Sequence, residues 1–279
     1  MSFKTIIVHI DDSPSSKQRL DAAIRAALDF SARLVGIYLV PAAELTPTVA
    51  ALLPADVVAR RLRETGDAQG RAEAIFRQTT AAAGLTAIDW RAPSGKPIVA
   101  AVAHARCADL TVIGQPDPDR PDFAFLEELA QTVALSAGRP ALITPYVAPV
   151  ASLGQRALIA WDGGREASRA VGDALPLLAR AKRVTVMVIQ SEPEIRIADS
   201  AATSRLVDYL HSHGIEARVD HSNVTEISPG EQLLSRAADL GIDLIVMGAY
   251  AHTRFRDLIL GGVTRTMLRS MTAPVLMSH

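Results

Sequence analysis

The sequence predicts an α/β protein built from two tandem, doubly wound domains, each with parallel strands in the order 3-2-1-4-5. Three observations lead to this fold class. Short apolar runs alternate with amphipathic helical patterns, as in βαβ units. The apolar runs contain few polar residues, which indicates strands covered by helices on both faces. The chain of 279 residues also has the length of two domains and repeats its own pattern.

Four motifs of the first half recur in the same order in the second half. Gly114 and Pro140 lie 26 positions apart, and so do Gly248 and Pro274. The recurring pairs are 6–13 with 157–164, 33–40 with 183–190, 108–114 with 242–248, and 139–143 with 273–277. Equal spacing across dissimilar residues indicates a duplication, so both halves are predicted to share one topology.

Serine and proline residues predict where the first helix begins and where the halves are joined. The helix is expected to start at 13–16, because serine caps helices and proline fits their first turn. An insertion at about Pro41–Arg63 has no counterpart in the second half, and its prolines predict a loop with a short helix. Two prolines also indicate a linker at 144–154. The predicted domain boundaries are therefore 1–147 and 155–279.

The last strand of each half is short and apolar, at Ala141–Ile143 and Val275–Met277. Two exposed edge strands of this kind would invite uncontrolled pairing with other chains. We expect them to meet within the chain as an intrachain pseudo-dimer, with homodimerisation as a further level of assembly.

Composition and charge exclude several classes of protein. The chain is 49% hydrophobic and 21% charged, so we expect packed cores rather than disorder. Its net charge of −1 gives no excess of positive charge that would attract nucleic acid or a membrane surface, so we expect neither as a partner. No apolar run approaches the ~18–20 residues that span a bilayer, and the start lacks a signal-peptide pattern. We therefore expect a cytoplasmic protein, with its single cysteine, Cys107, buried as a small hydrophobe.

The stretch 248–263 has the features of an anion site. Gly248 ends the fourth strand of the second half, and Gly261 and Gly262 precede a helical pattern. Backbone N–H groups at a helix N-terminus bind anions, and glycines let a ligand approach closely. The same glycines also suit a tight strand-to-helix turn without a ligand. The number of glycines alone leaves both interpretations open.

The spacing within this stretch resembles that of the universal stress protein family. Nucleotide-binding members carry Gly-x2-Gly-x9-Gly-(Ser/Thr) after the fourth strand, and this chain has Gly-x2-Ala-x9-Gly-Gly-Val over 248–263. The aspartates that follow the first strand of each half, Asp11 and Asp162, match as well. The resemblance covers nearly the whole chain as two copies. It implies a five-stranded parallel sheet per copy, a role in stress response, frequent dimerisation, and binding of ATP or a related adenine nucleotide with Mg.

The resemblance also implies which residues of the second half contact the nucleotide. Asp162 would border the adenosine, Gly248 would lie beneath the ribose and phosphates, and Gly262 would offer its N–H to the phosphates. The full set is Ala160, Asp162, Val188, Ile189, Met247, Gly248, Ala251, Gly261, Gly262 and Val263. Ala251 replaces the family's second glycine and Gly262 replaces its hydroxyl residue, so the predicted binding is weak.

The corresponding loop of the first half is predicted not to bind a nucleotide. Residues 115–122 include three prolines and three aspartates, and no glycine follows Gly114 until Gly138. Prolines lack N–H donors, and aspartates would repel a polyphosphate. The first copy is therefore interpreted as structural.

No catalytic constellation stands out in the sequence. His9 is interpreted as a hydrogen-bonded core histidine, and His211 and His213 as solvated residues. Because no nucleophile and base have positional support, we expect no dedicated enzyme and no metal site built from protein side chains alone. Two alternatives remain: a slow ATPase at the second-half loop, or an interaction module in which neither loop binds a ligand.

Overall fold

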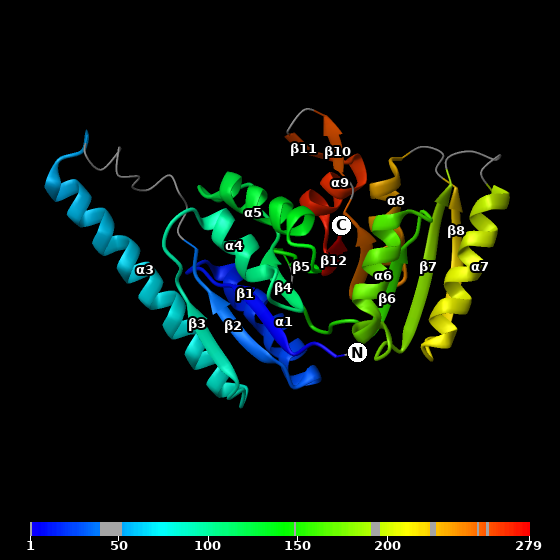
Figure 1. Ribbon diagram of the computed structural model, residues 1–279, viewed down its shortest axis with the longest axis horizontal. Coiled ribbons are helices and arrows are strands. Elements are labelled where there is room, and N and C mark those ends of the chain that lie inside the picture. Colours follow the sequence, from blue (N-terminus) through cyan, green and yellow to red (C-terminus); the bar gives the residue numbers. More distant parts are fainter. Residues whose placement is uncertain are drawn as a thin grey trace.

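One ten-stranded sheet runs through the whole molecule, in the order β3-β2-β1-β4-β5-β12-β9-β6-β7-β8 (Figure 1). The computed structural model describes residues 2–39, 52–147, 149–190, 196–223, 227–249, 251–254 and 257–279. Read outward from the centre of the sheet, each half contributes five strands in the order 5-4-1-2-3. This order confirms the doubly wound α/β topology predicted for each half.

The first half consists of alternating strands and helices. Its elements are β1 (Thr5–His9), α1 (Pro14–Phe30), β2 (Arg33–Ile37), α3 (Ala55–Ala82), β3 (Ile88–Arg91), α4 (Pro97–Ala105), β4 (Leu110–Gly114), α5 (Phe123–Ser136) and β5 (Ala141–Thr144). The strands β2, β1 and β4 pair in parallel with their neighbours.

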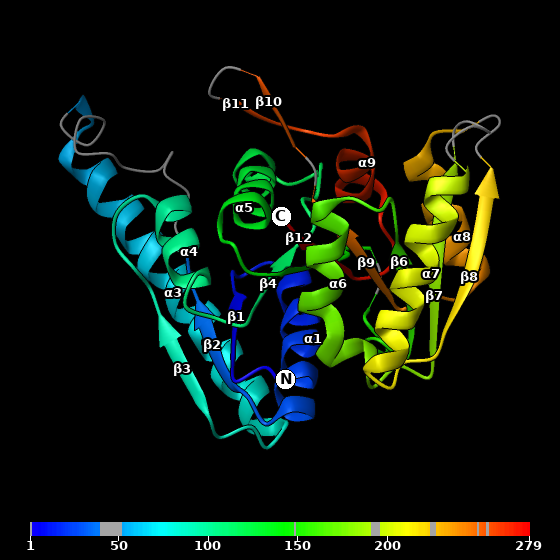
Figure 2. The same ribbon diagram turned by 45° about the vertical axis from the view of Figure 1, so that its right-hand side comes forward.

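The second half repeats this arrangement and adds a hairpin. Its elements are β6 (Arg156–Ala160), α6 (Arg165–Leu178), β7 (Arg183–Gln190), α7 (Arg196–Ser212), β8 (Ala217–Asn223), α8 (Pro229–Asp239), β9 (Leu244–Gly248), β10 (Ala251–Arg254), β11 (Asp257–Leu260), α9 (Gly262–Ser270) and β12 (Val275–Ser278). The antiparallel hairpin β10–β11 extends from the sheet between β9 and α9 (Figure 2).

The two halves join through their last strands, as the sequence predicted. β5 and β12 pair in an antiparallel register that places Leu142 opposite Leu276, and both side chains are fully buried. A second contact joins α1 to the turn after α6, where Arg180 forms an ion pair with Asp29 at 3.1 Å. The intrachain pseudo-dimer is thus a continuous sheet with no open edge at its centre.

Helices cover both faces of the sheet, which explains why the strands are apolar throughout. Successive strand residues point to opposite faces, so Ile6 and Val8 lie in one core cluster and Ile7 in the other. Helices α1, α3, α6 and α7 pack on the first face, whereas α4, α5, α8 and α9 pack on the second. Each fully buried Ile, Leu or Val side chain stabilises the fold by about 1.5–3 kcal/mol.

Two local predictions were wrong, and a third lies partly outside the described residues. α3 begins at Ala55, inside the predicted insertion, and continues for 28 residues; the earlier part of the insertion, up to residue 51, lies outside the described residues, so the short helix expected there stays a prediction. The segment between Gly248 and Gly261 is a hairpin over its described residues rather than an irregular loop. Cys107 is exposed rather than buried, because it lies in the turn between α4 and β4. Within the described ranges, every helix is too short or too polar to span a bilayer.

Candidate functional site

A cavity opens at the carboxyl ends of the strands in each half, where ligands bind in open parallel sheets. The second-half cavity has a volume of about 280 Å³. Seven of the ten residues predicted for nucleotide binding line it: Ala160, Asp162, Met247, Gly248, Gly261, Gly262 and Val263. The structure therefore brings together residues that are up to about a hundred positions apart in the sequence.

Gly248 lines this cavity at a position where no larger residue fits. A Cβ atom at this position would lie 2.6 Å from the backbone nitrogen of Ala167 and equally close to the carbonyl carbon of Glu166. The end of β9 thus packs directly against the first turn of α6. The requirement for glycine at 248 is a packing requirement.

Gly261 and Gly262 stand under a different constraint. Gly261 is the N-cap of α9 with φ −61° and ψ 155°, which other residues adopt readily. A Cβ atom at Gly262 would have no heavy atom within 4 Å. The first N–H groups of a helix have no intrahelical partner, the N-terminus of α9 carries no side-chain cap, and Gly261, Gly262 and Val263 line the cavity. This end of the helix has the geometry and the partial positive charge of an anion site.

Asp162 is fixed at the rim of the same cavity. Its Oδ1 accepts a hydrogen bond of 2.8 Å from the backbone N–H of Gly164, which forms an Asx-turn before α6. Gly163, between them, has φ +73° and so requires glycine. The Asp162 side chain is exposed, and it is the single acidic or basic side chain among the described residues that line the cavity.

Three of the predicted residues are placed differently. Val188 is buried in the core cluster on the opposite face of the sheet, whereas its neighbour Met187 lines the cavity. Ile189 belongs to β7, and its side chain lies outside the described part. Ala251 is the first residue of β10 and pairs with Leu260. Its extended backbone removes the strain that a left-handed alanine would cause.

Sequence reasoning missed several residues of the second-half cavity. Trp161 and Met187 lie at the ends of β6 and β7, Leu233 comes from α8, and Thr264 from the first turn of α9. They make one wall of the cavity largely apolar. Trp161 could have been identified, since it lies between Ala160 and Asp162 in the sequence, but α8 offered no local signal.

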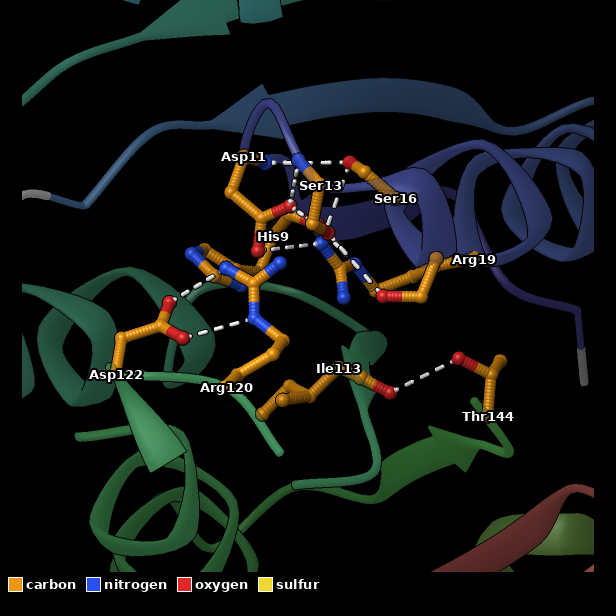
Figure 3. Close-up of polar contacts among 10 residues, drawn as sticks. His9, Asp11, Ser13, Ser16, Arg19, Ile113, Arg120, Asp122 and Thr144 are labelled. Atoms are coloured by element: carbon orange, nitrogen blue, oxygen red, sulfur yellow. Dashed lines mark hydrogen bonds and ion pairs between the residues drawn. The ribbon is translucent and has the colours of Figure 1, made fainter. Parts of the chain in front are cut away.

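The first-half cavity has a similar volume, about 270 Å³, but a different lining. Asp11, at the position that corresponds to Asp162, is buried and forms an ion pair of 3.2 Å with Arg19 of α1 (Figure 3). Ser13 donates to Asp11 Oδ1 from its backbone N–H at 2.9 Å and also from its hydroxyl. Burial opposes ionisation of this carboxyl, but the Arg19 guanidinium lowers its pKa well below the ordinary value of 3.8. Asp11 is therefore charged, and its carboxylate is already paired with Arg19.

Arg19 also contacts the ends of β1 and β4. Its Nε–H donates to the carbonyl oxygen of His9, and a Cβ atom at Gly114 would lie 2.3 Å from its guanidinium. Arg19 thus fills the space beside Gly114, where Gly248 packs against backbone in the second half. A Cβ at Gly248 would clash with backbone, whereas a Cβ at Gly114 would clash with the end of the Arg19 side chain.

His9 is buried, as predicted, but it is not hydrogen-bonded. It is 2% exposed, and neither ring nitrogen has a partner among the described residues. Burial, together with the charge on Arg19, lowers the pKa of His9 from 6.5 to about 4. At neutral pH the ring is uncharged and carries one donor and one acceptor. The prediction of a satisfied core histidine was therefore wrong.

Metal ligands do not gather in the part of the chain that the structure describes, since it contains no group of three or more His, Cys, Asp or Glu side chains suited to a metal ion. His211 is exposed and lies 3.1 Å from Glu216, consistent with its interpretation as a solvated residue.

Comparison with known proteins identifies relatives over both halves. The sequence model described as the universal stress protein family matches residues 2–145 and 154–279. A universal stress protein of Methanocaldococcus jannaschii is 35% identical over 48 residues, which cover 17% of this chain and 30% of that protein. One of Synechocystis sp. is 26% identical over 151 residues, which cover 52% of this chain and 49% of that protein. The chain thus spans half or less of the length of these curated relatives.

A solved structure extends the similarity to the complete chain. The crystal structure of a universal stress protein from Archaeoglobus fulgidus superposes with a TM-score of 0.72 and 15% identity, and the match covers 98% of this chain and 97% of that one. At this identity, the likeness shows a shared fold.

Proposed function

The chain belongs to the universal stress protein family, and from this premise we propose that it is a stress-response protein whose second half binds an adenine nucleotide such as ATP. The ligand occupies the second-half cavity. The phosphates lie over the N-terminus of α9, and Asp162 accepts a hydrogen bond from the ribose.

The observation that carries this proposal is the open N-terminus of α9. The backbone of Gly261 and the surroundings of Gly262 do not require glycine, so a turn alone does not explain this pair. Glycines that expose N–H groups without being needed for packing favour the phosphate cradle. Asp162 and the apolar wall around Met187 and Trp161 complete a site with one anionic and one apolar side.

The proposed binding is weak because the site lacks two features of nucleotide-binding members. Gly262 supplies no hydroxyl to a phosphate or to its Mg, which removes a hydrogen bond of about 0.5–1.5 kcal/mol. Mg therefore accompanies the nucleotide rather than being held by the protein. The cavity's described lining offers Asp162 and no histidine, cysteine or lysine as a catalytic group, which favours a nucleotide-responsive protein over a dedicated enzyme.

The domain boundaries 1–147 and 155–279 are part of the proposal. The described residues between Thr144 and Arg156 form neither a helix nor a strand, which supports a linker there. Homodimerisation is a further element of the proposal that the resemblance to the family supports.

Calorimetric titration of ATP tests the site. Asp162→Ala is expected to weaken binding by about tenfold to a hundredfold, the value of a hydrogen bond to a charged group. The double variant Ala251→Gly/Gly262→Ser is expected to tighten binding by up to about tenfold, because the cavity has room at Gly262. Asp208→Ala, at an exposed position of α7, serves as the control.

Two outcomes decide between this function and its alternatives. If neither the wild type nor the double variant binds ATP, the glycines serve only the turn, and an interaction module is the better description. If ATP is hydrolysed and Asp162→Ala abolishes turnover, the slow ATPase replaces the binding protein.

A further inference from the structure

We propose that the first-half cavity is a second, chemically different binding site, which takes a small uncharged molecule with an amide-type group. By this we mean an N–H donor beside a C=O acceptor, as in a carboxamide or a ring lactam. The proposal is independent of nucleotide binding in the second half.

His9 is the centre of the argument. Its side chain is 98% buried, lines the cavity, and has two ring nitrogens without a partner among the described residues. Leaving a buried polar atom unsatisfied costs about 1–3 kcal/mol. The second half has alanine at this position, Ala160, and folds in the same way, so the fold does not need an imidazole here. A polar ring at the base of a cavity is the kind of feature that a ligand explains.

The charges around His9 determine which ligand fits. Arg120 and Asp122 form a two-point ion pair with bonds of 2.8 and 2.7 Å, and Asp11 is paired with Arg19. Figure 3 shows His9 grouped with these two pairs. Three further charged residues line the cavity, Asp12, Arg61 and Glu64, but all three are exposed, unlike the buried His9. Beside His9, a charged ligand would have to compete with a partner that is already in place. The base of the cavity therefore selects against anions such as phosphate and against ammonium groups.

The hydrogen-bonding atoms that remain require both a donor and an acceptor. Because the low pKa of His9 keeps its ring uncharged, one nitrogen needs a donor from the ligand and the other needs an acceptor. Asp11 Oδ2 also has no hydrogen-bond partner, since its contact with Arg19 is not aligned as a hydrogen bond, and it too needs a donor. A carboxylate provides no donor and an ammonium no acceptor, whereas an amide provides both.

The size and the walls of the cavity limit the ligand to a single small ring or a similar molecule. A volume of about 270 Å³ lies just below the ~300–1,000 Å³ of pockets for drug-sized ligands. Its apolar surface comes from Leu39, Ala68 and Phe125. The Phe125 and His9 rings lie edge to face, with their centroids 6.4 Å apart. An amide on a flat ring matches this combination of polar base and apolar wall.

Nicotinamide and nicotinate make a matched pair of probes, because they share a shape and differ in charge and in the donor. Uracil represents the ring-lactam source. We expect nicotinamide or uracil to shift the ¹⁵N resonances of the His9 ring in the full-length protein, with nicotinate binding at least about tenfold more weakly. The probe that binds more tightly identifies the source of the amide.

His9→Ala is expected to weaken binding of the better probe at least about tenfold, while His211→Ala, at an exposed histidine, leaves it unchanged. His9→Ala introduces the residue that the second half has at this position, Ala160, so the variant is expected to fold. The ¹⁵N shifts of His9 in the wild type provide a second test that does not depend on the variant. The proposal is overturned if no probe shifts the His9 resonances, if nicotinate binds as well as nicotinamide, or if His9→Ala binds as the wild type does.

Discussion

Asp11 and Asp162 occupy the same position in the two halves, two residues after the first strand, yet Asp11 is buried in an ion pair and Asp162 is exposed. Asp162 is exposed and makes one local hydrogen bond, whereas Asp11 is buried against Arg19 and Ser13. The difference arises eight residues later, in the following helix. Arg19 of α1 corresponds to Ala170 of α6, and the longer side chain reaches back to neutralise the aspartate.

This comparison shows that one duplicated scaffold can hold two unlike cavities of nearly equal volume. The sheet order is the same in both halves, and a glycine ends the fourth strand in each, at Gly114 and Gly248. The lining is not, because His9 and Arg120 bring polar groups where the second half has Ala160 and an open helix N-terminus. Function in such a protein follows from a few side chains at strand ends rather than from the fold.

The largest expected loss of stability comes from breaking the ion pair between Arg19 and Asp11, which the second half lacks. Arg19→Met leaves Asp11 charged and buried, and removing one partner of a buried pair costs about 3–5 kcal/mol. The free energy of unfolding in urea measures this cost. Arg77→Met removes an exposed pair with Glu73 and should cost less than about 1 kcal/mol. A loss at Arg19 no larger than at Arg77 would contradict the role assigned to the pair.

Acid should destabilise the first half through His9. Because the pKa of His9 is about 4 in the folded protein and 6.5 when unfolded, the unfolded state takes up a proton first as the pH falls. Stability is therefore present above pH 6.5 and lost between pH 6.5 and 4, by about 3 kcal/mol. Asp11, with its lowered pKa, adds a further loss only below its ordinary value of 3.8.

Urea unfolding of the wild type and His9→Ala across this pH range isolates the contribution of the histidine. The variant should lose about 3 kcal/mol less than the wild type on acidification. Parallel pH profiles for the two proteins would show that the ring is not held uncharged.

The two glycines of the second-half cavity should respond differently to the same substitution. Gly248→Ala places a Cβ against the backbone of α6 and should cost about 1–3 kcal/mol. Gly262→Ala meets open space and should change stability by less than about 1 kcal/mol. Thermal unfolding compares the two. Equal costs would mean that both glycines are structural, which removes the main support for a phosphate cradle.

Much of the fold could be predicted from the sequence because repetition and periodicity are local signals. The 26-residue interval from Gly114 to Pro140 and from Gly248 to Pro274 identified the duplication, and the alternation of apolar runs with helical patterns identified the α/β class. The phase of a uniformly apolar strand is not a local signal, and this is why Val188 was chosen although Met187 lines the cavity. The length of α3 was missed because Pro54 precedes the helix rather than interrupting it.

The first-half site was harder to predict because its chemistry comes from side chains that meet only in the fold. His9 and Arg120 are separated by 111 positions, and nothing near His9 in the sequence indicates that its ring lacks a partner. The aspartates of residues 115–122 led to the prediction of a poor phosphate site, but they did not indicate that Asp122 would form an ion pair with Arg120.

The central claim, that the second half alone is the nucleotide site, is tested most directly by locating a bound nucleotide. Photocrosslinking with an 8-azido-adenine nucleotide, followed by peptide mapping, should label the peptides that line the second-half cavity, from β6, β7 or the start of α9. Excess ATP should prevent this labelling, and residues 1–147 should remain unlabelled. ATP-protected labelling of peptides that contain His9 or Arg120, or equal labelling of both halves, would contradict the account.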